Sequence, residues 1–336
     1  MIEIDGSSGE GGGQIIRTAV ALSAITGKPC MIEKIRAGRP NPGLQAQHLT
    51  AVKAVAKICG AETDAGIGST SLMFKPGTIR GGQHEIDIGT AGAVSLVLQS
   101  VILPSLHAEH PTSITIKGGT HVRWSPSMDY MQNIFCYYMK KLGLGADISI
   151  EQHGFYPRGG GVIKAKIIPG NPKPLDMTER GDLIAYEATS IASADLQKSQ
   201  VAERQLKRVE KIFPLSRRNI AYFQTASPGS AVHVSAVYEN CALGASSIGE
   251  RGKSAEKVGE EAANELKSDM DSGACFDRHM SDQILPFLAF AKNDSRIKVA
   301  EVTGHVRTNI QIIEKFLPVK FEIDEKEKII SVITNS

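Results

Sequence analysis

The sequence predicts an α/β protein: a large domain of three β-α-β-α-β-β repeats with a smaller inserted α+β domain. Three stretches, which begin at Ile32, Ile114 and Ile297, each read as a strand, a glycine-containing loop with Arg or His, a helix and another strand. A further helical pattern precedes each stretch. The segment from Gly181 to Gly273 interrupts the third unit with a pattern of its own. Strands and helices that alternate in this way pack helices on sheets.

Local signals mark the helices of the first two units. Pro42 and Pro126 lie where a helix is expected to begin, and Gly60 and Gly143 where one is expected to end. In the first of these helices, apolar residues recur on one face at helical spacing, namely Leu49, Val52, Ala56 and Cys59. These signals predict helices that pack on a sheet through one side.

Each unit also has an earlier helix and a closing pair of strands. The earlier helices are predicted over residues 14–26, 93–106 and 281–292. Turns between the closing strands are predicted near Pro76-Gly77, at residues 158–161 and at residues 324–328. The three units therefore share one order of elements.

The inserted segment follows a proline-rich linker, residues 171–176. Its predicted elements are a strand (183–190), a charged helix (196–213), three strands (219–224, 231–239 and 242–247) and a second charged helix (254–270). We expect residues 1–180 and 274–336 to form the large domain and residues 181–273 the small one. The charged helix faces are expected to be solvated.

Composition excludes several classes of protein. A chain of 336 residues with 41% hydrophobic residues can bury a substantial core, and a net charge of +2 argues against binding of nucleic acid by bulk charge. A small basic pocket for one RNA end remains open. We expect no transmembrane helix, because no apolar run approaches about 18 residues, and no signal peptide. Five scattered cysteines without a CxxC motif favour a reduced, cytoplasmic protein without structural zinc.

The glycine-rich stretch from Gly6 to Ala19 is the first candidate site. It has five glycines in eight residues and runs into a helix at Ile15 that carries Arg17. Backbone N–H groups at such a helix start bind anions. Glu10 would repel a phosphate unless a cation lay between them, so one hypothesis is a metal-bridged polyphosphate site. The alternative is a flexible turn. Neither the Walker pattern nor the dinucleotide fingerprint is present.

Arginines and a histidine form the second group of candidates. Arg17, Arg36 and Arg39 could clamp a phosphate by bidentate hydrogen bonds, or they could be unrelated surface residues. His305 follows a strand and precedes a helix, in the loop position that Arg39 and His121 occupy in the other units. A neutral imidazole there could be a base, a metal ligand or a nucleophile, or a plain surface residue.

Polar residues at helix starts complete the candidates. The segment HMSDQ, residues 279–283, takes the place of the glycine loop in the third unit. Asp282 and Gln283 could bind a ribose or a base, or cap a helix. Gln99 lies in an otherwise apolar helix, so it meets either a ligand or neighbouring backbone.

Four motifs, in this order, resemble those of RNA 3′-terminal phosphate cyclases: GSSGEGGGQIIR, IRAGRPNPGLQAQH, HMSDQ and GHVRTNIQIIEKF. The resemblance covers essentially the whole chain, including the insertion. It implies three repeats, each similar to the C-terminal domain of a translation initiation factor, and a small inserted domain.

The resemblance also implies an activity, that of an ATP-dependent ligase of RNA processing. Such an enzyme uses ATP and a divalent metal, Mg or Mn, to convert an RNA 3′-phosphate to a 2′,3′-cyclic phosphate. The family nucleophile falls on His305, which would attack the α-phosphorus of ATP and carry AMP to the RNA end. The 2′-OH would then close the ring and release AMP.

Further roles follow from the resemblance, residue by residue. Glu10 would contact the metal, and Gln14 and Arg17 would face phosphates. The nucleotide phosphates and the RNA terminus would be lined by Arg36, Arg39, Gln47 and His48. The ATP site would include Gln99, His279, Met280, Ser281, Asp282 and Gln283, and Pro126 would touch the adenine through its backbone.

Two alternatives remain. One is a non-catalytic RNA-binding protein of ribosome biogenesis on the same scaffold, a branch that lacks the histidine at position 305. The other is an enolpyruvyl transferase, which needs a phosphoenolpyruvate site and no nucleophilic histidine. RNA contact is expected to be independent of sequence. A homo-oligomer is left open.

Overall fold

The first unit contains four strands and two helices. The structure is a computed structural model that describes residues 1–9 and 11–334. In chain order the elements are β1 (Ile2–Asp5), α1 (Gly13–Thr26), β2 (Cys30–Glu33), α2 (Ala46–Cys59), β3 (Glu62–Thr63) and β4 (Leu72–Lys75). The sheet order is β1-β2-β4-β3, with β1 parallel to β2 and the other pairs antiparallel.

The second unit repeats this topology. Its elements are β5 (Gly82–Asp87), α3 (Val94–Leu106), β6 (Thr112–Gly118), α4 (Met128–Tyr130), a π-helical turn η1 (Met131–Phe135), α5 (Cys136–Lys141), β7 (Gly145–Gln152) and β8 (Gly161–Ile168). The sheet order is β5-β6-β8-β7, again with only the first pair parallel.

The third unit is split in the sequence. Its elements are β9 (Asp176–Met177), α8 (Met280–Gln283), α9 (Leu285–Leu288), β14 (Ser295–Lys298), α10 (Gly304–Phe316), β15 (Val319–Asp324) and β16 (Ile329–Thr334). The sheet runs β9-β14-β16-β15, with β9 parallel to β14. The same order of strands in all three units confirms the predicted repeat fold.

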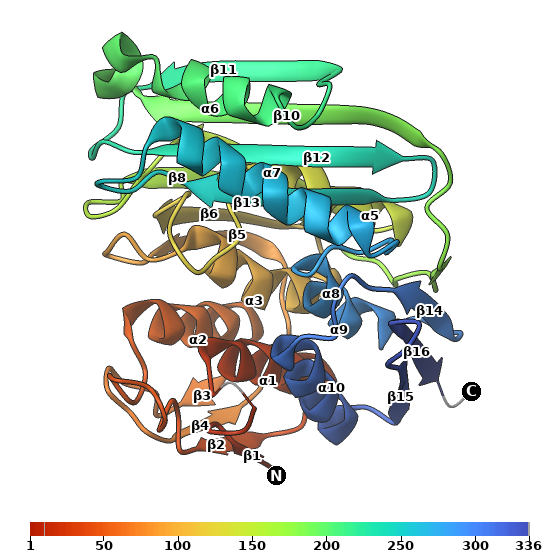
Figure 1. Cartoon of the computed structure of the whole chain (residues 1–336). Coiled ribbons are helices and arrows are strands. Elements are labelled where there is room, and N and C mark those ends of the chain that lie inside the picture. The colour runs from red at the N-terminus through yellow and green to blue at the C-terminus, as the bar shows by residue number, and fades with distance from the viewer. Residues whose placement is uncertain (10, 335–336) are drawn as a thin grey trace.

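The chain between β9 and α8 forms a fourth sheet with helices on it. Its elements are β10 (Leu183–Ser193), a 3₁₀ helix η2 (Ala194–Ser199), α6 (Val201–Glu210), β11 (Arg217–Phe223), β12 (Ser230–Tyr238), β13 (Ala242–Ile248) and α7 (Ala255–Asp271). The sheet order is β11-β10-β12-β13, and α6 and α7 lie together in front of it in Figure 1. We retain as a proposal that residues 181–273 form a separate domain from residues 1–180 and 274–336.

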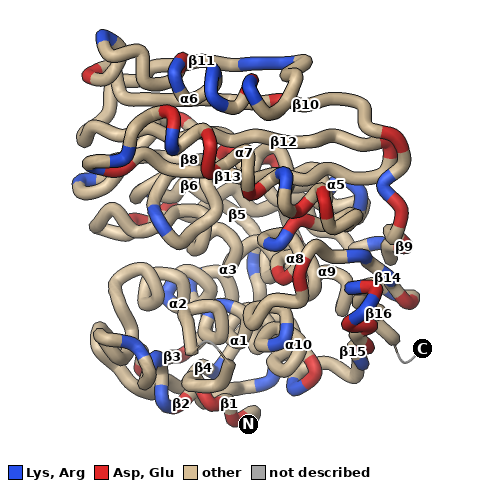
Figure 2. The backbone as a smooth tube through the Cα atoms, viewed as in Figure 1, with Lys and Arg blue, Asp and Glu red and all other residues tan. Residues whose placement is uncertain are grey.

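The charged faces of α6 and α7 are mixed in sign, as Figure 2 shows. Arg204 on α6 pairs with Glu256 on α7 at 2.7 Å, and Arg208 pairs with Glu260. These ion pairs tie the two helices together at their edge.

Some predicted element boundaries were wrong. The helix predicted for residues 281–292 is two short helices, α8 and α9, because Pro286 lies at the start of α9 and cannot donate a backbone hydrogen bond. The hairpin of the first unit turns through residues 64–71, and Pro76-Gly77 follows β4. The helix predicted for residues 196–213 is broken at Gln200, whose φ is 50°.

The glycines predicted to end helices do so, whereas the prolines predicted to begin helices lie before them. Gly60 and Gly143 have left-handed φ values of 62° and 75°, as residues after a helix often do. Pro42 and Pro126, however, lie outside their helices, since α2 and α4 are preceded by N-cap residues Gln45 and Ser127. Both prolines therefore lie in the loop before the helix and not at its first residue.

The helix α1 lies where the three units meet. This helix packs against α2, α3 and α10, so helices from all three units meet while the sheets lie outside them (Figure 1). Ile15, Ile16, Val20 and Leu22 of α1 are fully buried. The N-terminal end of α1 is therefore brought beside that of α10. No helix within residues 1–9 and 11–334 is long and apolar enough to cross a membrane.

Candidate active site

The glycine loop packs directly on two helix starts. Gly9 has a φ of +55°, and a Cβ there would collide with Oγ1 of Thr308 in the second turn of α10. A Cβ on Gly13 would collide with the ring of His48 in the first turn of α2. Glycine is needed at both positions because the loop comes so close to α10 and α2. Glu10, the predicted metal ligand, lies outside the described residues.

His305, the second residue of α10, is held by Gln14 at the start of α1. The Nδ1 atom of His305 shares a hydrogen bond with Oε1 of Gln14. The Nε2 atom of Gln14 donates to Oδ2 of Asp282 at 2.8 Å and to the carbonyl oxygen of His305 at 3.2 Å. Because the Gln14 amide nitrogen donates to two acceptors, its oxygen must accept a hydrogen bond from the N–H of Nδ1. This network assigns the lone pair of the neutral imidazole to Nε2.

Asp282 is itself held by residues that the sequence analysis did not single out. Asn309 on α10 donates from Nδ2 to the carbonyl oxygen of Asp282 at 2.9 Å. Thr18 on α1 donates to Oδ1 of Asn309 at 2.7 Å. The sequence carries no signal for this pair, because the burial of Asn309 and the half-burial of Thr18 follow only from the packing of α10 on α1.

Burial shifts the pKa values of Arg17 and Asp282 in a way that disfavours the charged form of each. It lowers the pKa of Arg17 to about 10, opposed by the charge of Asp282. It raises the pKa of Asp282 to about 7, opposed by His279 and Arg17. Arg17 is still a cation at neutral pH, whereas Asp282 is divided between its two forms.

A small cavity joins α1, α3, α8 and α10. Its volume is about 60 Å³, and the polar residues that line it are Gln14, Arg17, Thr18, Gln99, Ser100, Asp282, Gln283 and Asn309. Gln99 donates from Nε2 to Oε1 of Gln283 at 2.6 Å. The fold thus brings predicted residues from all three units to one place, and Gln99 meets a side chain of this group rather than backbone.

A basic group adjoins the glycine loop on the side of α2. Burial lowers the pKa of His48 to about 3, and the charges of Arg17 and Arg36 act in the same direction. Arg36 is half-buried, and burial followed by the charge of Arg39 lowers its pKa. A Cβ on Gly12 would lie 3.6 Å from Nη2 of Arg39. Arg17 and Arg39 thus lie against the loop, and burial, assisted by the charges of Arg17 and Arg36, leaves His48 neutral at ordinary pH.

Gln47 faces the second unit. Its Oε1 accepts a hydrogen bond from the backbone N–H of Ala93, the N-cap residue of α3, at 3.2 Å. Its neighbour His48 accepts one from the N–H of Gln45 at 3.2 Å. Gln47 and His48 thus stand between the arginines and the start of α3.

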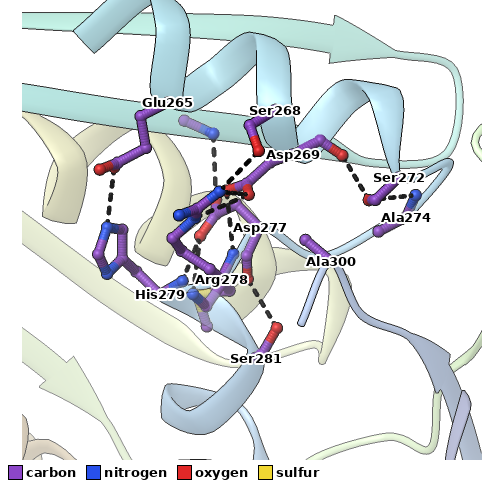
Figure 3. A network of polar contacts seen from close by, with 12 residues as sticks. Glu265, Ser268, Asp269, Ser272, Ala274, Asp277, Arg278, His279, Ser281 and Ala300 are labelled. Atoms are coloured by element: carbon purple, nitrogen blue, oxygen red, sulfur yellow. Dashed lines mark hydrogen bonds and ion pairs between the residues drawn. The ribbon is translucent and has the colours of Figure 1, made fainter. Parts of the chain in front are cut away.

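The segment that contains His279 is organised by the fully buried Asp277 (Figure 3). Its Oδ1 accepts the N–H groups of His279 at 3.0 Å and Met280 at 2.8 Å, and the hydroxyl of Tyr130 at 2.7 Å. The Nε2 atom of His279 lies 2.9 Å from Oε1 of Glu265 on α7. Burial disfavours the imidazolium, but Glu265 outweighs this and raises the pKa of His279 to about 9. His279 is therefore cationic at neutral pH.

Three residues predicted to bind the nucleotide do not line the cavity with their side chains. The side chain of Met280 is fully buried in the core, and Oγ of Ser281 donates to the carbonyl oxygen of Asp277 at 2.7 Å. Only their backbone is left for contact with a ligand. Pro126 is half-buried before α4 and is not among the described residues that line the cavity. His121, the counterpart of His305 in the second unit, is buried and bound to Asp129 at 2.6 Å.

Comparisons with known proteins cover nearly the whole chain. A family model described as RNA 3′-terminal phosphate cyclase matches residues 8–323. A protein of that name from Methanopyrus kandleri is 45% identical, with 97% of this chain and 96% of the relative covered. One from Pyrococcus furiosus is 42% identical (96% and 95% covered), and one from Methanosarcina barkeri is 41% identical (99% of each).

A solved structure, the enolpyruvyl transferase NikO from Streptomyces tendae, aligns with a TM-score of only 0.23 at 11% identity, covering 99% of this chain and 81% of that one. This likeness is too weak to support any conclusion. The family match and the relatives are decisive: the chain belongs to the RNA 3′-terminal phosphate cyclase family.

Proposed function

We propose that this protein converts an RNA 3′-terminal phosphate to a 2′,3′-cyclic phosphodiester at the expense of ATP. Membership of the family supports the overall reaction. The observation that carries the mechanism is the hydrogen bond between Gln14 and His305, because it places the proton of the neutral imidazole on Nδ1 and the nucleophilic lone pair on Nε2.

In the first step, Nε2 of His305 attacks the α-phosphorus of ATP. A nitrogen–phosphorus bond forms, the bond to the bridging oxygen breaks, and pyrophosphate leaves. The ring then carries AMP on Nε2 and a proton on Nδ1, where Oε1 of Gln14 accepts the hydrogen bond and stabilises the positive charge. Arg17, with Arg36 and Arg39 on the other side of the loop, would offset the negative charge of the phosphates.

In the second step, an oxygen of the RNA 3′-phosphate attacks the same phosphorus atom. The nitrogen–phosphorus bond breaks, His305 is regenerated, and the RNA ends in an anhydride with AMP. The neighbouring 2′-OH then attacks the RNA phosphorus, closes the five-membered ring and expels AMP. Activation is required because a phosphate monoester has no good leaving group for the 2′-OH to displace.

The other residues receive supporting roles. Gln99 and Gln283 line the cavity with Asp282, and we assign them, with the backbone of residues 279–281 and Pro126, to ATP. We assign Gln47, His48 and Arg39 to the RNA end. Asp282 acts through Gln14 by fixing its amide.

A divalent metal, Mg or Mn, is part of the proposal with Glu10 as its ligand. Among residues 1–9 and 11–334, no group of three or more His, Cys, Asp or Glu side chains is placed to hold a metal ion. We assign the metal to Glu10 together with phosphate oxygens, where it would neutralise phosphate charge.

We also propose a cytoplasmic location, in keeping with five free, buried cysteines. The alternative of a non-catalytic RNA-binding protein is disfavoured, because such a protein has no use for a histidine whose tautomer is fixed. The possibility of a homo-oligomer stays open.

Labelling of the protein with ATP tests the proposal. Incubation with α-labelled ATP and Mg should give an acid-labile, alkali-stable label on the wild-type chain. His305→Ala should abolish the label, whereas His110→Ala, an exposed histidine, should retain it. An unlabelled wild-type protein, or undiminished label on His305→Ala, would overturn the mechanism.

A further inference from the structure

Two large aromatic side chains are exposed on neighbouring loops of the second unit. Trp124 is 88% exposed and Tyr156 is 76% exposed. Trp124 is the one tryptophan of the chain. Aromatic side chains of this size are usually buried to a large extent, so their exposure together indicates a binding surface.

The two loops run side by side. His121 pairs with Phe155 in a parallel bridge, and the N–H of Thr120 donates to the carbonyl oxygen of Gly154 at 2.9 Å. Trp124 and Tyr156 follow these paired positions in the same direction. Trp124 has a left-handed φ of 64°, an uncommon conformation for a bulky residue. Such strain is typical of functional loops.

Arginines accompany the aromatic rings. The guanidinium of Arg123 lies 5.3 Å from the centre of the Trp124 ring, and its Nη1 is 3.1 Å from Oε2 of Glu250. Arg158 is exposed, and its backbone N–H is fixed by Oγ of Ser227 at 3.1 Å. We call Arg123, Trp124, Tyr156 and Arg158 the rim cluster. The rim cluster combines two aromatic rings, on which bases can stack, with two positively charged side chains.

A continuous line of contacts joins the rim cluster to the residues assigned to the RNA end. Gln47 binds the N–H of Ala93, and a Cβ on Gly92 would lie 3.1 Å from Cβ of Gln47. On the other side of this turn, a Cβ on Gly159 would lie 2.9 Å from Cα of Ala91. Gly159 is the neighbour of Arg158. Gln47 and Arg158 therefore flank the same turn before α3, so a strand whose 3′ end lies at Gln47 would have to span only this turn to reach the rim cluster.

We propose that the rim cluster binds the single-stranded RNA that precedes the 3′-terminal phosphate. Bases stack on Trp124 and Tyr156, while Arg123 and Arg158 contact the phosphodiester backbone. Aromatic rings with arginines bind single strands of any sequence in this way, because every base has a π-face. The inference rests on the proposed function for the position of the 3′ end.

Fluorescence of Trp124 tests the binding directly, since no other tryptophan contributes. Titration without ATP should show saturable quenching by an oligonucleotide of about ten nucleotides with a 3′-phosphate. The affinity should fall as salt rises. ATP alone should quench weakly. Quenching by ATP as strong as that by RNA would assign the ring to the nucleotide and overturn the proposal, as would the absence of quenching by RNA.

Kinetics with substrates of two lengths provide the second test. Trp124→Ala and Tyr156→Ala should each raise KM for the decamer about 5- to 150-fold, the range expected for loss of one stacked base. KM for a dinucleotide 3′-phosphate, which is too short to reach the rim cluster, should change less than about twofold. Ile184→Ala and Arg296→Ala remove an exposed apolar group and an exposed charge elsewhere and serve as controls. Equal effects on both substrates would contradict the proposal.

The two proposals fail separately. If the protein is not a cyclase, no label and no cyclic product form, yet quenching of Trp124 by RNA still reports on the surface. If the rim cluster does not bind RNA, cyclisation proceeds while quenching and length dependence are lost.

Discussion

Nδ1 of His305 and Oε1 of Gln14 share a hydrogen bond although the two residues are 291 positions apart in the chain. The bond joins the starts of α10 and α1, which belong to the third and first units. It determines which imidazole nitrogen carries the proton, and it therefore determines which nitrogen can react.

Removal of this acceptor should slow the attack on ATP. We expect Gln14→Ala to lower the rate of enzyme adenylylation on the order of 10- to 100-fold, because the ring loses its orienting partner. Single-turnover labelling measures the rate. Gln132→Ala, which removes a half-buried glutamine bound to the Ile148 carbonyl oxygen, should leave the rate unchanged. A wild-type rate in Gln14→Ala would mean that the tautomer is set elsewhere.

Asp282 should lower stability as the pH rises. Its pKa is raised by burial from 3.8 to about 7, so the folded state holds this proton more tightly than the unfolded state does. Its contribution to stability therefore falls between about pH 4 and pH 7. Asp282→Asn should raise Tm at pH 8 relative to wild type, by about 2–4 °C for each kcal/mol gained, and should have little benefit at pH 4. Melting curves of both proteins at pH 8 and pH 4 test this expectation. An increase in Tm of the same size at pH 4 would exclude titration of Asp282 as its cause.

The pair of His279 and Glu265 should stabilise the protein at neutral pH. The pKa of His279 is raised from 6.5 to about 9, mainly by Glu265 and against burial, so its contribution is complete below pH 6.5 and lost through pH 9. His279 is half exposed, so we expect Glu265→Gln to cost only about 0.5–1 kcal/mol at pH 6. At pH 10 the cost should vanish. Urea unfolding at pH 6 and pH 10 measures the loss in free energy of unfolding. Lys267→Gln, which changes an exposed ion pair on the same helix, is the control.

Gly13 should be intolerant of a side chain. Gly13→Ala places a Cβ against the ring of His48 and against Nη1 of Arg17, so it should displace the groups assigned to phosphate and raise KM for ATP or RNA. Gly27→Ala is the matched control: its φ is +66° but its Cβ would meet no atom within 4 Å. That control should cost about 1 kcal/mol of stability and spare catalysis. Similar kinetics for the two variants would argue against the close approach.

Arg39 should matter for turnover and little for folding, since it is exposed beside Gly12. Arg39→Ala should reduce cyclisation on the order of 100-fold, as loss of a cation beside reacting phosphates does. Its Tm should stay close to that of wild type. Arg296→Ala provides the comparison for loss of one exposed charge. An unchanged rate would remove Arg39 from the site.

The repeat could be predicted from the sequence because its signals are local. Gly60 and Gly143 end helices by a backbone preference, and the glycines at 159–160 and the charged turn at 324–328 mark real hairpins. The two-residue strand β9 gives no such signal, since its place depends on pairing with β14. The break in the helix after Gln283 coincides with Pro286, which has no backbone N–H to continue the helical hydrogen bonds.

The candidate residues could be named from the motifs, but their arrangement could not. Nothing in the sequence says that Gln14 faces His305 rather than a phosphate, because the packing of α1 on α10 decides it. Thr18 and Asn309 were missed for the same reason: a polar residue on a helix is ordinary until its neighbours are known.

The division of the third unit has a consequence for the order of folding. Strand β9 leaves the ribosome before the inserted segment, yet its partner β14 and the helix with His305 come after it. Closing so long a loop is entropically costly unless the intervening chain first becomes compact, because the cost grows with the length of the loop. Folding of residues 181–273 would bring its two ends together and shorten the effective loop. The strand pairing that precedes His305 in the third unit would then form only after residues 181–273 have folded.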